Sequence, residues 1–359
     1  MKLLNFKGRN LKIVEKFKFF APIALCVIIA GAIVMGVLGL NVGLDFGGGV
    51  KIEAETGYYL STHADAKPQV EKVIEDTVKN NGFDLSYVRW SENDADGVTA
   101  EIGLNYKYEG KKIDSKDATA QSEFTKKIQG DELDTSSSLS TKIMEALNEY
   151  SAANFGGEME VEETPRVRIV NASTFTKLLK NSIWATLAAV AVILIYICIR
   201  FTLSSGLAAI IALCHDVMVM IALTAMFRIE VNVTFIAAII TIVGYSINAT
   251  IVIFDRIREL KKADSLKDAS DAEIANRAIA DTLGRSILTT ITTLVVIVAL
   301  AVVCQIMGVS SMNEFALPIV FGLIAGAYSS VLLSAPMWVL LRKIGRKMKK
   351  GGKAKKQKA

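Results

Sequence analysis

The stretch TIVGYSINATIVIFDRIREL, residues 241–260, lies in one of the longest apolar runs of the chain, yet it carries hydrogen-bonding side chains and ends in a burst of charge. An apolar run of about 20 residues is long enough to cross a bilayer as a helix. Five such runs carry little or no charge, and a sixth qualifies except for His215 and Asp216 at its centre. The sequence therefore predicts a bundle of six transmembrane helices, at residues 20–40, 183–199, 206–227, 233–254, 287–307 and 315–341.

The composition agrees with a membrane protein, because 52% of the 359 residues are hydrophobic. The first run resembles a secretory signal sequence, since basic residues precede it and small residues lie inside it. Its apolar length exceeds the core of about 7–15 residues that such signals have. An uncleaved membrane anchor is therefore the favoured interpretation.

Charge is divided unevenly along the chain. Residues 45–163 hold 25 acidic and 12 basic side chains, whereas the rest of the chain holds 11 acidic and 29 basic ones. Because loops rich in Lys and Arg stay in the cytoplasm, the basic N-terminus (1–19) and the basic tail (342–359) are predicted to be cytoplasmic, and residues 42–175 to be exported. A basic tail can bind nucleic acid, but beside a span an orientation signal that lies on anionic membrane lipids is favoured, with no nucleic-acid partner.

The exported region has the pattern of a folded α+β domain. Its apolar spacing predicts a series of strand, helix, strand, strand, helix and strand, at residues 49–55, 68–82, 85–91, 98–106, 138–152 and 158–170. This order is that of a ferredoxin-like domain, in which two helices cover one face of an antiparallel sheet. Residues 109–137 are rich in Lys, Asp, Ser and Thr, and we expect them to form a solvated insertion.

Only the cytoplasmic loop at residues 255–286 has room for a further helix between the later spans. Its segment DAEIANRAIADTLGRS, residues 271–286, is amphipathic and runs straight into the fifth span. The pattern predicts a helix that lies along the membrane surface.

Asp216 is expected near the bilayer midplane, where an ionised carboxylate is costly unless it is protonated, paired or hydrated. It should therefore face the bundle interior. Two roles are open for it: a proton-responsive coupling residue, or a buried acid that fixes helix packing. His215 precedes it, but neighbours on a helix point about 100° apart, so the two side chains need not interact.

Polar residues of the fourth and fifth spans are further candidates. Ser246 and Thr250 are one helical turn apart on a predicted inward-facing stripe, which Asn248 flanks. Arg285 opens the fifth span. It either extends to the cytoplasmic interface or pairs with an acid and shifts the pKa of that acid, as a coupling site requires.

Small residues indicate where backbones approach closely. Gly322, Gly326 and Ser330 recur every four residues on the sixth span and predict a helix-packing face. Gly244 in the fourth span is a further packing candidate. In GLDFGGGV, residues 43–50, the absence of a following Gly-Lys-Ser/Thr argues against a phosphate-binding loop. We expect a flexible entry into the exported domain there, formed by Asp45, Gly47 and Gly48.

Several function classes are disfavoured. All four cysteines fall inside predicted spans, which indicates neither a disulfide framework nor a metal site. The chain has only two histidines and no arrangement of nucleophile and base. We therefore expect neither an enzyme nor a cofactor-binding or metal-binding protein.

An ordered set of motifs over nearly the whole chain resembles the SecF family, the smaller membrane subunit of the bacterial SecD–SecF complex. The matching motifs are GLDFGGG (43–49), IYICIRF (195–201), HD (215–216), GYSIN (244–248), FDRIRE (254–259), GRSILTTITTL (284–294) and FALPIVFGLIAGAYSSVLLSAP (315–336). Each motif is weak alone, and the specificity lies in their order.

The resemblance implies six spans, like one half of a resistance-nodulation-division (RND) transporter, with an exported ferredoxin-like domain between helices 1 and 2. It implies residence in the bacterial inner (cytoplasmic) membrane and SecD, the SecYEG channel, YajC and translocating unfolded polypeptide as partners. It also implies use of the proton gradient to complete export. A sodium-coupled form stays open, since Ser, Thr, Asn and backbone carbonyls suit that ion.

One departure from the family pattern concerns Ala249. The fourth-span motif of the family usually reads Gly-Tyr-Ser-Ile-Asn-Asp-Thr, and Ala249 stands where the aspartate is expected. Alanine cannot ionise, so this subunit does not relay protons there, or Asp216, Asn248 and water compensate, or SecD supplies the acid. The segment RVRIVNASTFTKLLKN, residues 166–181, also lacks the Gly-Pro pattern that the family often shows. The alternative hypotheses are an RND-type exporter half for small molecules or lipids, and a SecF-like scaffold without proton coupling.

Overall fold

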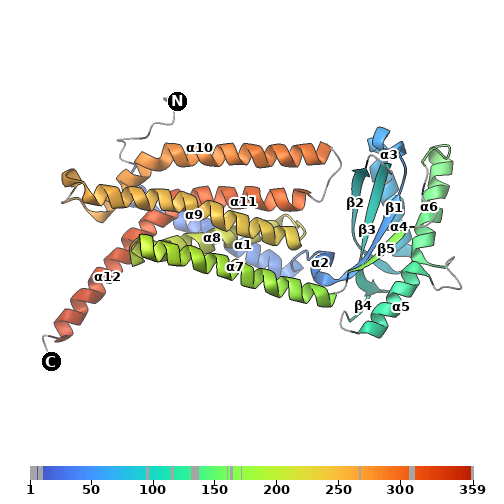
Figure 1. The fold of residues 1–359 in the computed structure, drawn as a ribbon, viewed down its shortest axis with the longest axis horizontal. Coiled ribbons are helices and arrows are strands. Elements are labelled where there is room, and N and C mark those ends of the chain that lie inside the picture. Colours follow the sequence, from blue (N-terminus) through green and yellow to red (C-terminus); the bar gives the residue numbers. More distant parts are fainter. Residues whose placement is uncertain are drawn as a thin grey trace.

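The computed structural model describes residues 6, 11–93, 97–114, 117–130, 137–159, 161, 165–170, 172–266, 268–306 and 312–356. A helical bundle and a smaller domain built on a sheet lie end to end along the longest axis of the molecule (Figure 1). We call the second part the sheet domain; it begins at strand β1 and ends at strand β5.

Long helices, most of them apolar, form the bundle. They are α1 (Phe17–Leu38), α7 (Ala172–Arg200), α8 (Leu203–Met226), α9 (Val233–Lys262), α10 (Asp271–Ile306), α11 (Asn313–Ser329) and α12 (Ala335–Lys356). Short 3-10 turns lie at Asp264–Leu266 (η3) and, in the sheet domain, at Ala64–Ala66 (η2). A π-helical turn, η5 (Ser330–Ser334), joins α11 to α12. It precedes Pro336, whose ring nitrogen cannot donate the next helical hydrogen bond.

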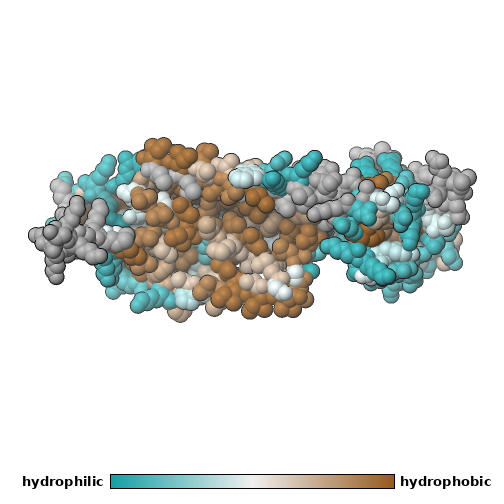
Figure 2. All heavy atoms as spheres, turned by 90° about the horizontal axis from the view of Figure 1, so that it is seen from below, coloured by the Kyte–Doolittle hydropathy of each residue, from teal (hydrophilic) through white to brown (hydrophobic). Residues whose placement is uncertain are grey.

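Within the described residues, six helical stretches are long and apolar enough to cross a membrane, and all six predicted spans overlap them. Met307, the last residue of the fifth predicted span, lies outside the described residues. On the face of the molecule that Figure 2 shows, apolar side chains cover much of the bundle, whereas most of the coloured side chains of the sheet domain are hydrophilic. The chain is therefore a multi-pass membrane protein.

Helix α10 corrects the prediction of a helix along the membrane surface. It is one continuous helix of 36 residues, about 54 Å long, which exceeds the hydrocarbon thickness of about 30 Å. Its first turns bury Ile274, Ala278 and Ile279 in a core shared with the end of α9 and with Trp338 of α12. The amphipathic face thus packs on protein. At the start of α10, Asp271 forms ion pairs with two arginines of α12, Arg342 and Arg346.

The sheet domain has an antiparallel sheet with strand order β2-β3-β1-β5. The strands are β1 (Gly49–Glu55), β2 (Phe83–Asn93), β3 (Gly97–Tyr108) and β5 (Arg166–Val170), and the two-residue β4 (Lys111–Lys112) pairs with β3. Helices α4 (Lys67–Asn80) and α6 (Leu139–Asn154) contribute buried residues to one core with the sheet, and α3 is a single turn (Tyr59–Thr62). The predicted helices and the first three predicted strands match within a few residues; of the fourth, 158–170, the described strand covers Arg166–Val170.

Residues 109–137 are not simply a solvated insertion. They contain helix α5 (Ala118–Gln129), which buries Phe124 and Ile128 in the core of the sheet domain. The ring of Phe124 lies 5.5 Å, centroid to centroid, from the rings of both Phe83 and Tyr106. The polar composition of the segment concealed two apolar residues one helical turn apart.

The entry into the sheet domain is also more ordered than expected. Helix α2 (Leu44–Gly47) forms there and buries Leu44. Gly48 has φ +71°, a conformation that favours glycine. A Cβ at Gly49 would collide with the carbonyl oxygen of Leu104 in β3. The glycines thus allow a tight packed turn, with Asp45 half-buried in it.

Candidate functional site

A fully buried carboxylate, Asp216 on α8, lies at the junction of three helices. Its Oδ2 accepts hydrogen bonds from the hydroxyl of Ser246 on α9 and, at 2.8 Å, from that of Ser329 on α11. Its Oδ1 lies 2.9 Å from Nδ1 of His215. We call these four residues the Asp216 cluster. Buried charges need such partners, and the cluster can hold a carboxylate or a proton inside the bundle.

Glycines of α11 allow this close approach. A Cβ at Gly326 would lie 3.3 Å from Cβ of Ser246 and 3.6 Å from Oδ2 of Asp216. One turn earlier, a Cβ at Gly322 would lie 2.5 Å from a side-chain carbon of Ile242 on α9. The predicted small-residue face therefore lies against α9 and the Asp216 cluster, and Ser330 is buried at its end.

His215 turns toward its neighbour despite the helical spacing. Its ring stacks on that of Tyr328 at 6.0 Å between centroids, and the Tyr328 hydroxyl donates to the carbonyl of Phe20 in α1 at 2.5 Å. Nε2 of His215 is buried and has no hydrogen-bond partner within the described part of the chain. The histidine thus connects the Asp216 cluster to the side of the bundle where α1 packs.

The structure divides the candidates of the fourth span between two faces of α9. Ser246 and Thr250 are buried, as the stripe predicts. Asn248 is exposed, so the prediction that it flanks the inward stripe is wrong. Gly244 is exposed as well, and a Cβ there would meet nothing within 4 Å, so it packs against no other helix among the described residues. Neighbours two residues apart on a helix point to nearly opposite sides.

A second group of polar side chains lies between α9 and α10, around Ala249. Here a cavity of ≈ 110 Å³ is lined by Tyr245, Asn248, Ala249, Val252, Arg285, Ser286, Thr289 and Thr290. Tyr245 donates to the hydroxyl of Thr290 at 3.2 Å. Arg285 is exposed and forms no ion pair within the described residues. We call this cavity and the residues that line it the Ala249 cavity. None of these lining residues belongs to the Asp216 cluster.

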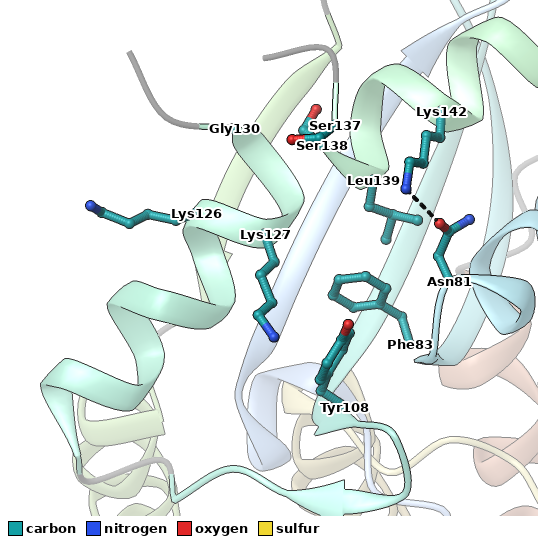
Figure 3. A pocket seen from close by; sticks show the side chains of 10 residues that line it. All are labelled: Asn81, Phe83, Tyr108, Lys126, Lys127, Gly130, Ser137, Ser138, Leu139 and Lys142. Atoms are coloured by element: carbon teal, nitrogen blue, oxygen red, sulfur yellow. Dashed lines mark hydrogen bonds between the residues drawn. The ribbon is translucent and has the colours of Figure 1, made fainter. Parts of the chain in front are cut away.

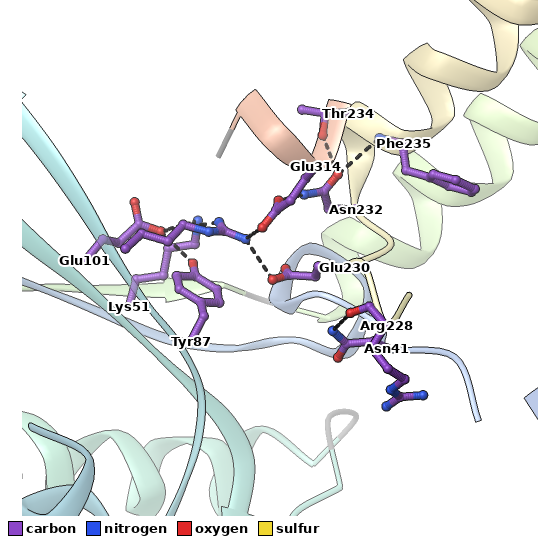
Figure 4. Close-up of polar contacts among 11 residues, drawn as sticks. Asn41, Lys51, Tyr87, Glu101, Arg228, Glu230, Asn232, Thr234, Phe235 and Glu314 are labelled. Atoms are coloured by element: carbon purple, nitrogen blue, oxygen red, sulfur yellow. Dashed lines mark hydrogen bonds and ion pairs between the residues drawn. The ribbon is translucent and has the colours of Figure 1, made fainter. Parts of the chain in front are cut away.

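A third polar contact, which the sequence did not indicate, joins the sheet domain to the bundle (Figure 4). Arg89 of β2 binds Glu230, between α8 and α9, at 2.7 Å, and also binds Glu314 at the start of α11. We call these three residues the Arg89 contact. The side chain of Asn232 donates to Glu314, and its oxygen accepts from the backbone of Phe235 at 3.1 Å, which caps α9. Segments far apart in sequence thus meet at one guanidinium.

The charges of the Arg89 contact perturb one another. Burial alone would lower the pKa of Arg89, but the carboxylates of Glu230 and Glu314 raise it above its ordinary value. Burial, helped by the charge of Asp45, raises the pKa of Glu230 although Arg89 opposes the shift. The contact is therefore an ion-pair site with more negative than positive charge.

A cavity of ≈ 370 Å³ lies in the sheet domain beside α5 and α6 (Figure 3). Two of its lysines are engaged. Lys142 donates to Asn81 at 2.9 Å, and Nζ of Lys127 lies 3.8 Å from the ring centroid of Tyr108. These contacts hold the two lysines against other residues that line the cavity.

Together, a multi-pass helical bundle with a buried carboxylate and a sheet domain between its first two long helices define an integral membrane protein with a folded domain outside the bundle. The family described as protein export membrane protein SecD/SecF, C-terminal, matches residues 151–344. Protein translocase subunit SecF of Borreliella burgdorferi is 34% identical over 223 residues, which cover 62% of this chain and 71% of that protein. The chain belongs to the SecF family.

Longer and shorter relatives extend the comparison. The SecF subunit of Alicyclobacillus acidocaldarius is 38% identical over 57% of this chain, and SecDF of Bacillus subtilis is 33% identical over 94% of it. The chain spans 65% and 38% of the length of these two proteins, respectively. The crystal structure of SecDF from Thermus thermophilus, a translocon-associated membrane protein, superposes with a TM-score of 0.64 at 24% identity, over 94% of this chain and 39% of that one. This likeness supports the fold.

Proposed function

We propose that this chain is an accessory subunit of the Sec protein translocase that acts with a SecD chain and uses the proton gradient to assist late steps of export through SecYEG. The observation that carries the proposal is the Asp216 cluster within a SecF-family bundle. A carboxylate held by hydroxyls from two other helices accepts weaker hydrogen bonds from them once it binds a proton. Proton binding there would therefore be linked to the packing of α8, α9 and α11.

Asp216 is the candidate for proton handling within this chain, because Ala249 cannot ionise. His215, whose Nδ1 lies within hydrogen-bond distance of the Asp216 carboxylate, provides a second titratable group in the same cluster. The transport role of both is part of the proposal. The hydroxyls of Ser246 and Ser329 would stabilise the ionised carboxylate by donating hydrogen bonds to it, and these hydrogen bonds would weaken when the carboxylate binds a proton.

The Ala249 cavity supports SecD as the partner. Asn248, Arg285 and Thr289 are exposed around it, and none of the apolar stretch of α10 is buried within the described structure. Polar side chains at membrane depth favour contact with protein over lipid. In this proposal SecD covers the face and supplies an acid opposite Arg285.

The sheet domain is, in this proposal, the exported ferredoxin-like domain that engages translocating polypeptide. Its strand order and the helices on one face support the ferredoxin-like assignment. The basic N-terminal segment and tail support cytoplasmic termini in the bacterial inner membrane. Contact with SecYEG and with YajC belongs to the same proposal.

The test is copurification combined with export. We expect the tagged full chain to copurify with a SecD chain and with SecYEG from membranes, and we expect its depletion to slow the release of exported proteins. Purification with neither partner would overturn the proposal. An efflux assay on the purified chain separates the alternative, because substrate efflux without a partner would instead indicate an RND-type exporter half.

A further inference from the structure

The Arg89 contact brings one cation between two carboxylates that come from different parts of the bundle. The side chains of Arg89, Glu230 and Glu314 are 15%, 11% and 16% exposed, respectively. Water therefore screens them poorly, and their net charge matters more than it would on an open surface.

The surrounding charges do not restore neutrality. On the sheet, Lys51 of β1 lies 3.2 Å from Glu101 of β3, which also lies 4.0 Å from Nη1 of Arg89. The charge of Lys51 opposes the rise in the pKa of Glu230, but one lysine does not balance both Glu101 and the second carboxylate of the contact. The hydroxyl of Tyr87 donates to the same glutamate, and its ring lies 3.7 Å from the guanidinium carbon of Arg89. Asp45 of α2 adds a further negative charge near Glu230.

The loop between α8 and α9, which holds Glu230, also holds the basic residue Arg228, which binds elsewhere. The guanidinium of Arg228 donates to the carbonyl of Gly39 at 2.6 Å. Arg89 thus faces Glu230 and Glu314 with no second cation paired to either carboxylate within the described residues. With both carboxylates ionised, the contact buries an uncompensated negative charge, and one bound proton removes it.

We propose that docking of the sheet domain on the bundle takes up a proton on the Glu230–Glu314 pair, so that the Arg89 contact tightens as the pH around it falls. The raised pKa of Glu230 agrees in sign. A carboxyl whose pKa is higher in the docked state binds its proton more tightly there, so docking is favoured below that pKa and weakened as pH rises through it. Each unit of difference in pKa between docked and undocked states changes their ratio by up to about tenfold.

The contact also ties the sheet domain to particular helices. Glu314 lies in the first turn of α11, and Asn232, which binds Glu314, caps α9. These are the helices whose serines donate to Asp216. A change in docking would therefore alter contacts of α9 and α11, two of the three helices at the Asp216 cluster. The inference stands without any role in export, because it concerns only the docking equilibrium of the chain.

The experiment measures a distance between the two parts of the full chain in lipid nanodiscs. Spin labels are placed at Lys72→Cys on α4 and Val37→Cys on α1, both exposed positions, in a chain whose four native cysteines are serine. We expect one narrow distance distribution at mildly acidic pH and a broader or longer one at mildly alkaline pH. Glu230→Gln, which mimics the protonated form, should stay narrow at both pH values.

The Gln variant distinguishes proton uptake from simple attraction between opposite charges, for which removal of a carboxylate would loosen the contact. Arg168→Gln, which removes a pair with Glu53 elsewhere on the sheet, is the control and should keep the wild-type pH response. An unchanged distribution between acidic and alkaline pH in the wild type would overturn the proposal. So would a Glu230→Gln variant that is broader than the wild type at alkaline pH.

Discussion

The hydroxyl of Ser329, on α11, donates a 2.8 Å hydrogen bond to Oδ2 of Asp216, on α8. Ser246 donates to the same oxygen from α9. One carboxylate oxygen therefore joins helices that are distant in sequence. The Asp216 cluster links packing inside the membrane to a titratable group.

Removal of one of these donors should weaken the bundle. In Ser329→Ala, Oδ2 of the buried carboxylate keeps only the Ser246 donor, so we expect the free energy of unfolding to fall by about 1–3 kcal/mol. Chemical denaturation in mixed micelles measures this loss. Thr241→Ala is the control, because that exposed hydroxyl bonds only a carbonyl of its own helix, Ala237; equal losses for the two variants would contradict the assignment.

Two glycines make a matched test of helix packing. In Gly322→Ala the new methyl group would meet the side chain of Ile242 at 2.5 Å. We expect a loss of about 1–3 kcal/mol, as for other overpacked sites. Gly244→Ala meets nothing within 4 Å, and it should be neutral or stabilising by up to about 1 kcal/mol, because alanine favours helices. The same denaturation measurement decides between them, and a reversed order would refute the packing account.

The sheet domain should depend on Phe124 although the segment around it is polar. Phe124→Ala removes the ring that packs between Phe83 and Tyr106, and we expect a loss of about 3–5 kcal/mol in local stability. Hydrogen exchange of the full chain would show faster exchange in α5. Glu123→Ala, at an exposed neighbouring position, should leave that exchange unchanged. Equal protection of α5 in both variants would argue that the helix does not belong to the core.

The proposed SecD surface predicts where cross-links form. Asn248→Cys and Thr289→Cys, beside the Ala249 cavity, should cross-link to SecD in membranes that contain both chains. Trp184→Cys, exposed on α7, is the control on another helix. Cross-links from α7 alone would place the partner elsewhere.

The sequence predicted those parts of the fold that depend on local pattern. The spans follow from apolar run length, and the first strands and the helices α4 and α6 follow from short-range periodicity. Polar composition between residues 109 and 137 hid α5, because among the side chains of α5 that the structure describes, only the apolar Phe124 and Ile128 are deeply buried. No local signal shows whether an amphipathic segment lies on a membrane surface or, as in α10, packs on protein and continues straight into a span.

The candidate site was predictable only in part. A carboxylate in the middle of an apolar span is conspicuous in the sequence, so Asp216 and its inward direction could be expected. The stripe of Ser246 and Thr250 on the fourth span suggested Ser246. The sequence did not indicate Ser329 as a partner. Nor could it indicate the Arg89 contact, because residues 89, 230 and 314 meet only through the docking of the sheet domain.

The central claim, that Asp216 couples the proton gradient to export, is tested most directly by measuring the fraction of a secreted protein that completes export as the imposed proton gradient is varied. We expect export with the wild-type chain to rise with the gradient and export with Asp216→Asn, which keeps a polar group of similar size, to lose that response. Ala249→Asp places an acid beside Arg285, and we expect it to retain a gradient response because Asp216 is intact. If wild type, Asp216→Asn and Ala249→Asp all respond alike, the subunit does not couple protons through Asp216, and the claim is contradicted.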